Sequence, residues 1–232
     1  MLKILFLAVA ILGCFSLKAN PVPFPPTPDG YSRGSNTPQL HLEVFYDLLC
    51  PGSQNQWNIL EPLLKNTYHI DSNQTLRFTI HVFPLPYHIH AFTMAQGAKI
   101  IAANQAQASD IYTYLDIVFK NQDSFQTDGT LGNSSTQIQK ALTQLVVAQF
   151  PNVSNYFLDG LISGSQYDVQ ARVSWKYGTS RQVTGTPTFF ANGVQVNGAY
   201  GFEEADWINF INGGYVSYIR QAQAKKLGLI EL

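Results

Sequence analysis

Two segments of the chain alternate apolar and polar side chains with a period of two. Residues 40–46 (LHLEVFY) and residues 76–82 (LRFTIHV) carry apolar side chains at every even position. This alternation predicts two strands whose even-numbered side chains face the core. Phe45 lies on the odd-numbered face, which indicates that the far end of the first strand is half buried on its second side as well.

A hairpin is predicted near the C-terminal end by the sequence FFANGVQV, residues 189–196. Asn192 and Gly193 are preferred at the centre of a type I′ turn because both central positions require a positive φ. Apolar residues stand on both sides of this pair, so we expect one strand to enter the turn and another to leave it.

Helical spacing begins directly after residue 50. Pro51 suits the first turn of a helix, where its missing N–H leaves no hydrogen bond unmade. Trp57, Leu60 and Leu64 then follow at i, i+3 and i+7 and would share one buried face. Pro62 is expected to end or kink this helix.

Residues 91–177 contain one proline, and their apolar residues recur at helical spacing, which predicts about four helices between the strands. Ser109 and Ser135 stand where N-caps are expected. A last helix is predicted to open at Glu203 and Glu204. Its apolar face runs through Gly213-Gly214, a weak point, to Tyr218.

The N-terminal residues have the pattern of a secretory signal. A short basic start precedes an apolar run at residues 4–15, which is too short to cross a bilayer, and Ala19 is a small residue suited to cleavage. We predict a signal peptide over residues 1–19, hence secretion, with residence in an endomembrane lumen as the alternative. Residues 20–38 are rich in proline and are expected to form an extended leader outside any ladder or helix.

Composition narrows the choice of partners. The formal net charge is −1 and charged residues make up 12% of the chain, so neither nucleic acid nor an anionic membrane is an expected partner. Three sequons predict N-glycosylation of a secreted chain, at Asn73, Asn133 and Asn152. About two sequons are expected by chance in a chain of this composition, so they carry little weight.

Cys50 is the candidate for chemistry. Removal of residues 1–19 also removes Cys14, and the mature chain then has one cysteine. A lone cysteine in a secreted protein is a reactive thiol, an intermolecular bridge such as a disulfide-linked homodimer, or a buried inert side chain. Its place at a helix start favours the thiolate, and the neighbouring Pro51, Gly52 and Ser53 favour access over packing, so we predict a nucleophile.

The segment FYDLLCPGS, followed about 130 residues later by TGTPTFFANG, resembles the thioredoxin fold in its DsbA-like form. FPLPYHIHAF, residues 83–92, resembles the segment that leads into the helical domain of that family. The resemblance implies an α/β thioredoxin-like fold, a central mixed sheet flanked by helices, with an inserted all-helical domain. The implied boundaries are residues 39–90 and 181–222 for the thioredoxin-like domain, 91–180 for the insertion and 223–232 for a C-terminal tail.

The resemblance also implies roles for individual residues. Cys50 takes the place of the nucleophile, Ser53 that of the resolving cysteine, and Pro187 that of a cis-proline. Thr186 would offer backbone groups to a substrate lying across Cys50, with Pro51 and Gly52 beside it. The partners implied are cysteine-containing client proteins or glutathione, the latter as a co-substrate, and no cofactor is expected.

Two departures from the family pattern limit the chemistry. With Ser53 in place of a second thiol, no internal disulfide forms, so attack by Cys50 stops at a mixed disulfide until another thiol resolves it. Gly52 stands where such sites often carry a histidine that stabilises thiolate, and Asp47 would oppose a thiolate if it lay close. The prediction is monothiol or isomerase-type exchange.

Other interpretations compete with exchange. The same segment is similar to the start of kappa-class glutathione transferases, although Cys50 stands where their serine is expected, and glutathione is scarce outside the cell. A non-enzymatic binding protein with a degenerate site around Pro187 is the chief rival. His88 and His90 are two potential metal ligands, but a third ligand is not evident and no metal is expected. Ser53 lacks the sequence context of a hydrolase nucleophile.

Overall fold

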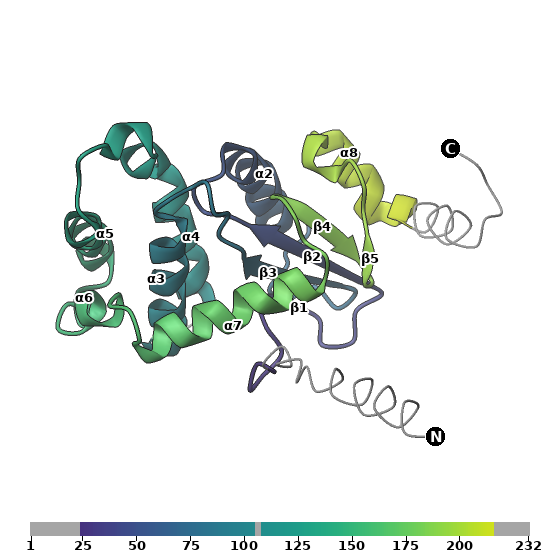
Figure 1. The fold of residues 1–232 in the computed structure, drawn as a ribbon. Helices are drawn as coiled ribbons and strands as arrows, with labels where there is room; N and C mark the ends of the chain where they lie inside the picture. Colours follow the sequence, from purple (N-terminus) through teal and green to yellow (C-terminus); the bar gives the residue numbers. More distant parts are fainter. Residues whose placement is uncertain (1–23, 105–107, 216–232) are drawn as a thin grey trace, which may run out of the picture.

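The computed structural model describes residues 24–104 and 108–215 (Figure 1). The predicted signal peptide at 1–19, the C-terminal tail at 223–232 and the end of the last predicted helix at Tyr218 lie outside the described residues. No helix in the described part is long and apolar enough to span a membrane.

Five strands form one mixed sheet in the order β1-β3-β2-β4-β5. β2 and β3 are parallel, and the other neighbours are antiparallel. The two strands predicted from period-two alternation are β2 and β3, and the predicted hairpin is β4 and β5, with positive φ at its two turn residues. The strands are β1 Tyr31–Gly34, β2 Leu40–Tyr46, β3 Leu76–Val82, β4 Thr188–Ala191 and β5 Val194–Gln195.

The prediction that residues 20–38 stay outside any ladder was wrong for residues 31–34. These residues form β1, which pairs with β3 from Tyr31 opposite Ile80 to Gly34 opposite Arg77. The prolines lie before and after this stretch, so its N–H groups are free to join the edge of the sheet. Arg33 then anchors the strand, because its guanidinium is 2.8 Å from a Glu61 carboxylate oxygen.

Among the described residues, five α-helices lie between β3 and β4, where about four helices were expected, and the shortest of them has four residues. Figure 1 shows α3 to α6 gathered beside the sheet, while α7 runs across it. The helices are α2 Pro51–Pro62, α3 Ala91–Asn104, α4 Ala108–Lys120, α5 Ser135–Gln149, α6 Phe157–Gly160, α7 Gln166–Ser180 and α8 Glu204–Asn209.

The helix ends agree with the predicted proline position, but both predicted N-cap residues were wrong. Ser134, not Ser135, caps α5, because its hydroxyl accepts from the backbone N–H of Gln137 in a capping box. Ser109 lies inside α4 rather than at its cap. The α-helical part of α2 ends at Pro62 as predicted, and a π-helical turn, Leu63–Thr67, follows.

The last helix also shows its predicted weak point. α8 gives way to a π-helical segment, Phe210–Gly214, in which Gly213 has φ +123°. Glycine adopts this positive φ without a steric penalty because it has no Cβ. The helix is therefore interrupted at the Gly213-Gly214 pair.

Helices cover both faces of the sheet. Even-numbered side chains of β2 belong to the same core cluster as Trp57 of α2 and Trp207 of α8. On the other face, Phe45 stacks on Tyr177 of α7 with ring centroids 6.2 Å apart. Phe45 is therefore fully buried rather than half buried, because α7 covers that end of the strand.

Buried charges join the N-terminal segment to this second face. His81 of β3 places Nδ1 2.8 Å from a carboxylate oxygen of Asp29, and Lys99 of α3 lies 3.5 Å from the other. Glu43 of β2 is 3.2 Å from the guanidinium of Arg181. Burial alone would raise the pKa of both carboxyls, but the hydrogen bonds and positive charges outweigh it and lower the pKa of each to about 2.

Acid should weaken this cluster. In an unfolded chain these carboxyls titrate near 3.8 and 4.5, so the stability they contribute is present above those values and is lost as the pH falls toward 2. We expect about 2 kcal/mol for each carboxyl, measured as the change in free energy of unfolding by urea between pH 5.5 and pH 2.5. Asp29→Asn should remove its share of that change. An exposed control, Asp159→Asn, should keep all of it, and equal pH profiles for the two variants would contradict the assignment.

Candidate functional site

Cys50 caps the N-terminus of α2, directly after β2. Its backbone is extended, with φ −83° and ψ 122°, and Pro51 occupies the first helical turn. The Cys50 N–H donates to the carbonyl oxygen of Asp47 at 3.1 Å, and its own carbonyl accepts from Gln54 N–H at 3.1 Å. The sulfur therefore lies at the end of the helix where N–H groups have no partner within the helix.

A distant loop closes over the sulfur. The Cys50 Sγ–H donates to the carbonyl oxygen of Thr186 at 3.3 Å, and the peptide bond between Thr186 and Pro187 is cis. Gly52 faces the same loop: a Cβ at this position would lie 3.3 Å from Pro187 Cδ and 3.8 Å from the Cys50 sulfur. Four of the predicted site residues thus meet, although more than a hundred positions separate the two segments in the sequence.

Access to the sulfur is narrower than the sequence indicated. Cys50 is 9% exposed, whereas its neighbours Pro51 and Gly52 are exposed. Ser53 is fully buried, and its hydroxyl has no hydrogen-bond partner among the described residues. The site therefore presents a slightly exposed Cys50 between the exposed Pro51 and Gly52 on one side and the Thr186 carbonyl on the other, while Ser53 is buried.

The family described as thioredoxin matches residues 27–209, which is most of the sequence. The chain belongs to the thioredoxin family. No curated protein sequence was found to be similar to it.

Solved structures share the fold of this thioredoxin-family chain. A candidate protein-disulfide isomerase of Pseudomonas syringae has a TM-score of 0.64 at 18% identity, over 79% of this chain and 98% of that one. The alpha-DsbA1 protein of Wolbachia pipientis has a TM-score of 0.62 at 19% identity, over 84% and 96%. MdbA of Actinomyces oris, a thiol-disulfide oxidoreductase, has a TM-score of 0.56 at 16% identity, over 75% and 79%. The predicted fold class, a DsbA-like thioredoxin fold, is confirmed.

Two glutamines hold the loop that carries Cys50 in this thioredoxin-family site. Gln122 is 1% exposed, and its amide donates to the carbonyl oxygens of Leu48 at 3.0 Å and Cys50 at 3.1 Å. Gln126 donates to the carbonyl of Leu49 at 2.9 Å. Both come from the segment after α4. Sequence reasoning missed them because a polar residue between two helices carries no signal of its long-range partner.

The Asp47 carboxylate is occupied by backbone N–H groups and by a histidine. Its two carboxylate oxygens accept from Leu49 N–H at 2.7 Å, from Leu85 N–H at 2.8 Å and from His88 Nδ1 at 2.7 Å. Burial raises the pKa of this fully buried carboxyl, and the three hydrogen bonds oppose that rise. Asp47 thus ties the loop before Cys50 to the loop that leads into α3.

Asp47→Ala should strongly destabilise the protein. Two buried backbone N–H groups and the His88 ring would lose their acceptor together, and we expect a loss of about 3–5 kcal/mol in the free energy of unfolding. Urea unfolding at pH 7 measures it. The exposed residue Asp159 supplies the control, since Asp159→Ala should change stability by less than about 0.5 kcal/mol. Similar losses for the two variants would contradict the role given to Asp47.

The two histidines considered as metal ligands have separate partners. His88 pairs with Asp47, a carboxylate neighbour that the sequence did not reveal, and His90 Nε2 lies 2.9 Å from the hydroxyl of Thr130. Within the described ranges, no group of three histidine, cysteine or carboxylate side chains is arranged so that it could hold a metal ion.

The three sequons differ in setting. Asn133 and Asn152 are exposed. Asn73 is partly buried, and its side-chain amide donates to the carbonyl of Tyr68 at 2.8 Å while its oxygen accepts from Leu76 N–H at 2.8 Å. Glycosylation stays a prediction. Asn133 and Asn152 are better placed for it than Asn73 because they are exposed.

Proposed function

We propose that this thioredoxin-family protein is secreted and carries out thiol–disulfide exchange through Cys50 as its single nucleophile. One observation carries the proposal: the Cys50 sulfur lies at the N-terminus of α2, within 3.3 Å of the Thr186 carbonyl oxygen that precedes Pro187. A client chain crossing Cys50 would meet both a nucleophile and backbone groups able to hold it in an extended form.

The exchange proceeds in two balanced steps. The Cys50 thiolate attacks one sulfur of a client disulfide, a new S–S bond joins Cys50 to that sulfur, and the other client sulfur leaves as a thiolate. A second thiol, from the client or from glutathione, then attacks the mixed disulfide and releases Cys50 as a thiolate. The protein gains and loses no electrons over the cycle, which makes rearrangement its natural outcome.

The helix terminus supports the first step. Gly52 and Ser53 contribute backbone N–H groups in the first turn, where they have no partner within the helix, and a thiolate is stabilised at this positive end. Ser53 has no thiol to complete an internal disulfide, so resolution passes to an external thiol. This is why the proposal is monothiol or isomerase-type exchange.

Secretion is part of the proposal and rests on residues 1–19. We expect cleavage after Ala19, and the mature protein in the medium should begin at Asn20. N-terminal sequencing of the protein from a secreting host tests this. Retention of Met1 in the cell fraction would contradict secretion and leave the exchange chemistry to be judged by itself.

The exchange itself is tested by trapping its first step. After incubation with oxidised glutathione, intact-mass spectrometry should find one glutathione per chain, and peptide mapping should place it on Cys50. Ser53→Ala should trap equally well, because its hydroxyl has no partner to lose. Cys50→Ser should trap none. If the native protein remains unmodified while an added small thiol reacts under the same conditions, the proposal fails.

Two alternatives use the same surface around Cys50 and Thr186. The 9% exposure of Cys50 favours a binding protein that holds extended chains at Thr186 without chemistry, in which case peptides bind equally well to Cys50→Ser. A glutathione-handling protein would bind S-methylglutathione, which cannot exchange, in a calorimetric titration. A disulfide-linked homodimer through Cys50 remains a further prediction, which a non-reducing gel would reveal.

A further inference from the structure

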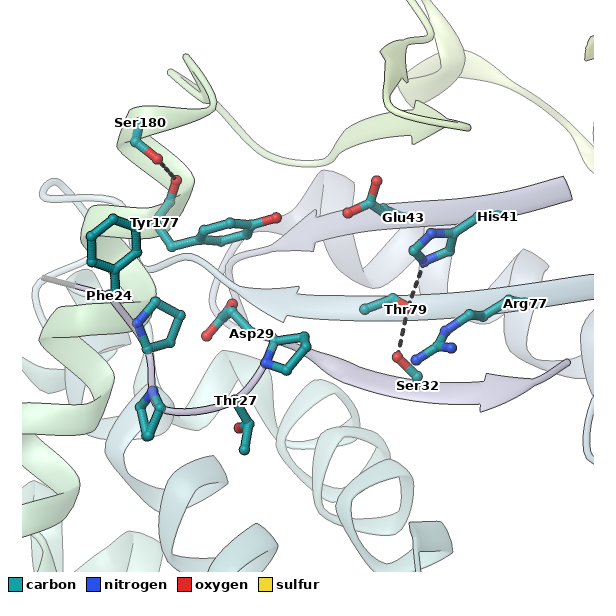
Figure 2. A pocket seen from close by; sticks show the side chains of 13 residues that line it. Phe24, Thr27, Asp29, Ser32, His41, Glu43, Arg77, Thr79, Tyr177 and Ser180 are labelled. Atoms are coloured by element: carbon teal, nitrogen blue, oxygen red, sulfur yellow. Dashed lines mark hydrogen bonds between the residues drawn. The ribbon is translucent and has the colours of Figure 1, made fainter. Parts of the chain in front are cut away.

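A cavity that does not include Cys50 lies between the sheet and the N-terminal segment. Its volume is about 750 Å³, within the usual range for sites that take a small organic molecule. The odd-numbered side chains of β2 and β3 form one wall, residues 24–28 form another, and Tyr177 and Ser180 of α7 close the side (Figure 2). The proposed exchange reaction uses none of these residues.

The charge in the cavity comes from Arg77. The two carboxylates that line it are already paired, Asp29 with Lys99 and His81, and Glu43 with Arg181. Arg77 makes one long hydrogen bond, 3.5 Å to the side-chain oxygen of Asn36, and its Nε has no partner among the described residues. A buried guanidinium nitrogen without an acceptor is costly, so an anion at this point would be stabilised.

Neutral hydrogen-bonding groups stand beside the guanidinium. His41 Nε2 and Ser32 Oγ both lie 2.8 Å from Thr79 Oγ1, and burial and the charge of Arg77 help to lower the pKa of His41. The strand register explains the grouping, because Arg77 lies opposite His41 on β2 and Thr79 lies opposite Ser32 on β1. Figure 2 shows the Arg77 side chain beside Ser32 and Thr79 on the sheet wall.

The opposite wall is apolar. Three proline rings and the phenyl ring of Phe24 face the cavity, and Figure 2 shows Phe24 and Tyr177 at the end away from Arg77. The Phe24 side chain is 92% exposed, so its apolar surface is available for contact with a ligand. The cavity therefore has a cationic end and an apolar end.

We propose that this cavity is a binding site for a small organic carboxylate with an aromatic or aliphatic body. The carboxylate would accept from the Arg77 guanidinium and from the Ser32 hydroxyl, whose oxygen in turn accepts from the Thr79 hydroxyl, and the body would lie against residues 24–28 and Tyr177. A cationic ligand is disfavoured because the local carboxylates already have cationic partners.

The site is separate from Cys50 by position as well as by chemistry. His41 and Arg77 stand at the beginning of the parallel strands, whereas Cys50 follows the end of β2, a full strand length of about 16 Å further on. Failure of the exchange proposal would therefore leave this one untouched, and binding can be measured without any redox reaction.

The test compares 2-naphthoate with its neutral analogue 2-naphthamide by isothermal titration calorimetry on the full chain. We expect one site per chain and at least tenfold tighter binding of the acid, because the ionic hydrogen bonds to Arg77 are absent for the amide. Arg77→Gln should weaken 2-naphthoate binding by at least tenfold. Lys140→Gln, which removes a positive charge from an exposed position on α5, should leave it unchanged.

A charge-conserving variant protects the test against misfolding. Arg77→Lys keeps the cation but not the fork of donors, and it should bind 2-naphthoate more weakly than the native chain and more tightly than Arg77→Gln. Circular dichroism confirms that each variant is folded. Equal affinity for acid and amide, unchanged binding by Arg77→Gln, or no binding of 2-naphthoate at millimolar concentration would each overturn the proposal.

Discussion

Replacing Cys50 with serine is expected to reduce the rate at which this protein rearranges a scrambled-disulfide client to the uncatalysed rate. A serine hydroxyl does not attack disulfides, and the described residues hold no second thiol to substitute for Cys50. The measurement is recovery of activity by a scrambled client enzyme in a glutathione buffer. The fold should survive, because the side chain is small and its one hydrogen bond, to the Thr186 carbonyl, is one that a hydroxyl can also donate.

The control for this experiment lies one helical turn away. Ser53→Ala should retain the native rate, since the hydroxyl it removes is buried and has no hydrogen-bond partner within residues 24–104 and 108–215. The comparison also decides between the two leading functions. If the native protein and Cys50→Ser rearrange the client at equal rates while both bind it, the surface around Cys50 and Thr186 serves binding and Cys50 is a structural residue.

Ser53→Cys is expected to convert a monothiol site into a dithiol site. Residue 53 lies three positions after Cys50 at the start of α2, the spacing at which paired thiols at a helix N-terminus form a disulfide. Ser53 is fully buried and its hydroxyl makes no hydrogen bond in the part of the chain that the structure describes, so the surroundings must accommodate only the larger sulfur. In oxidised glutathione, the variant should lose both free thiols to one intramolecular disulfide, detected by alkylation and mass spectrometry.

The same variant should gain a reaction that the native chain lacks. An internal disulfide stores an oxidising equivalent, so oxidised Ser53→Cys should oxidise a reduced dithiol peptide stoichiometrically without glutathione. The double variant Cys50→Ser with Ser53→Cys has one thiol and should do neither. Two thiols that stay free in oxidised glutathione would show that residue 53 does not face Cys50, and the comparison with two-cysteine members of the family would then fail at this position.

The local pattern predicted most of the secondary structure. β2 and β3 follow from alternation, the β4–β5 hairpin from Asn192-Gly193, and the start of α2 from Pro51. Each depends on residues within a few positions of one another. β1 was missed for the complementary reason: the four residues YSRG have no pattern of their own, and they form a strand because the edge of β3 supplies their hydrogen bonds.

The candidate site divides in the same way. The position of Cys50 at a helix start could be predicted, but the partners that shape the site could not. Asp47 bonds to His88, 41 positions away, and Gln122 bonds to Leu48, 74 positions away. Such pairs form only when helices and loops pack together. The periodicity of apolar residues along the chain does not predict them.

From the sequence alone came the strands with their buried faces, the helix that begins after Cys50, and the absence of a second cysteine three positions after that residue. Tertiary packing alone decided that Cys50 would be 9% exposed against the Thr186 carbonyl, and that Arg77 would stand in a cavity with an unpaired nitrogen. The reason is physical. Backbone geometry and side-chain alternation act between neighbours along the chain, whereas exposure and polar pairing depend on which distant segments exclude water from a group and which of them bring it a partner.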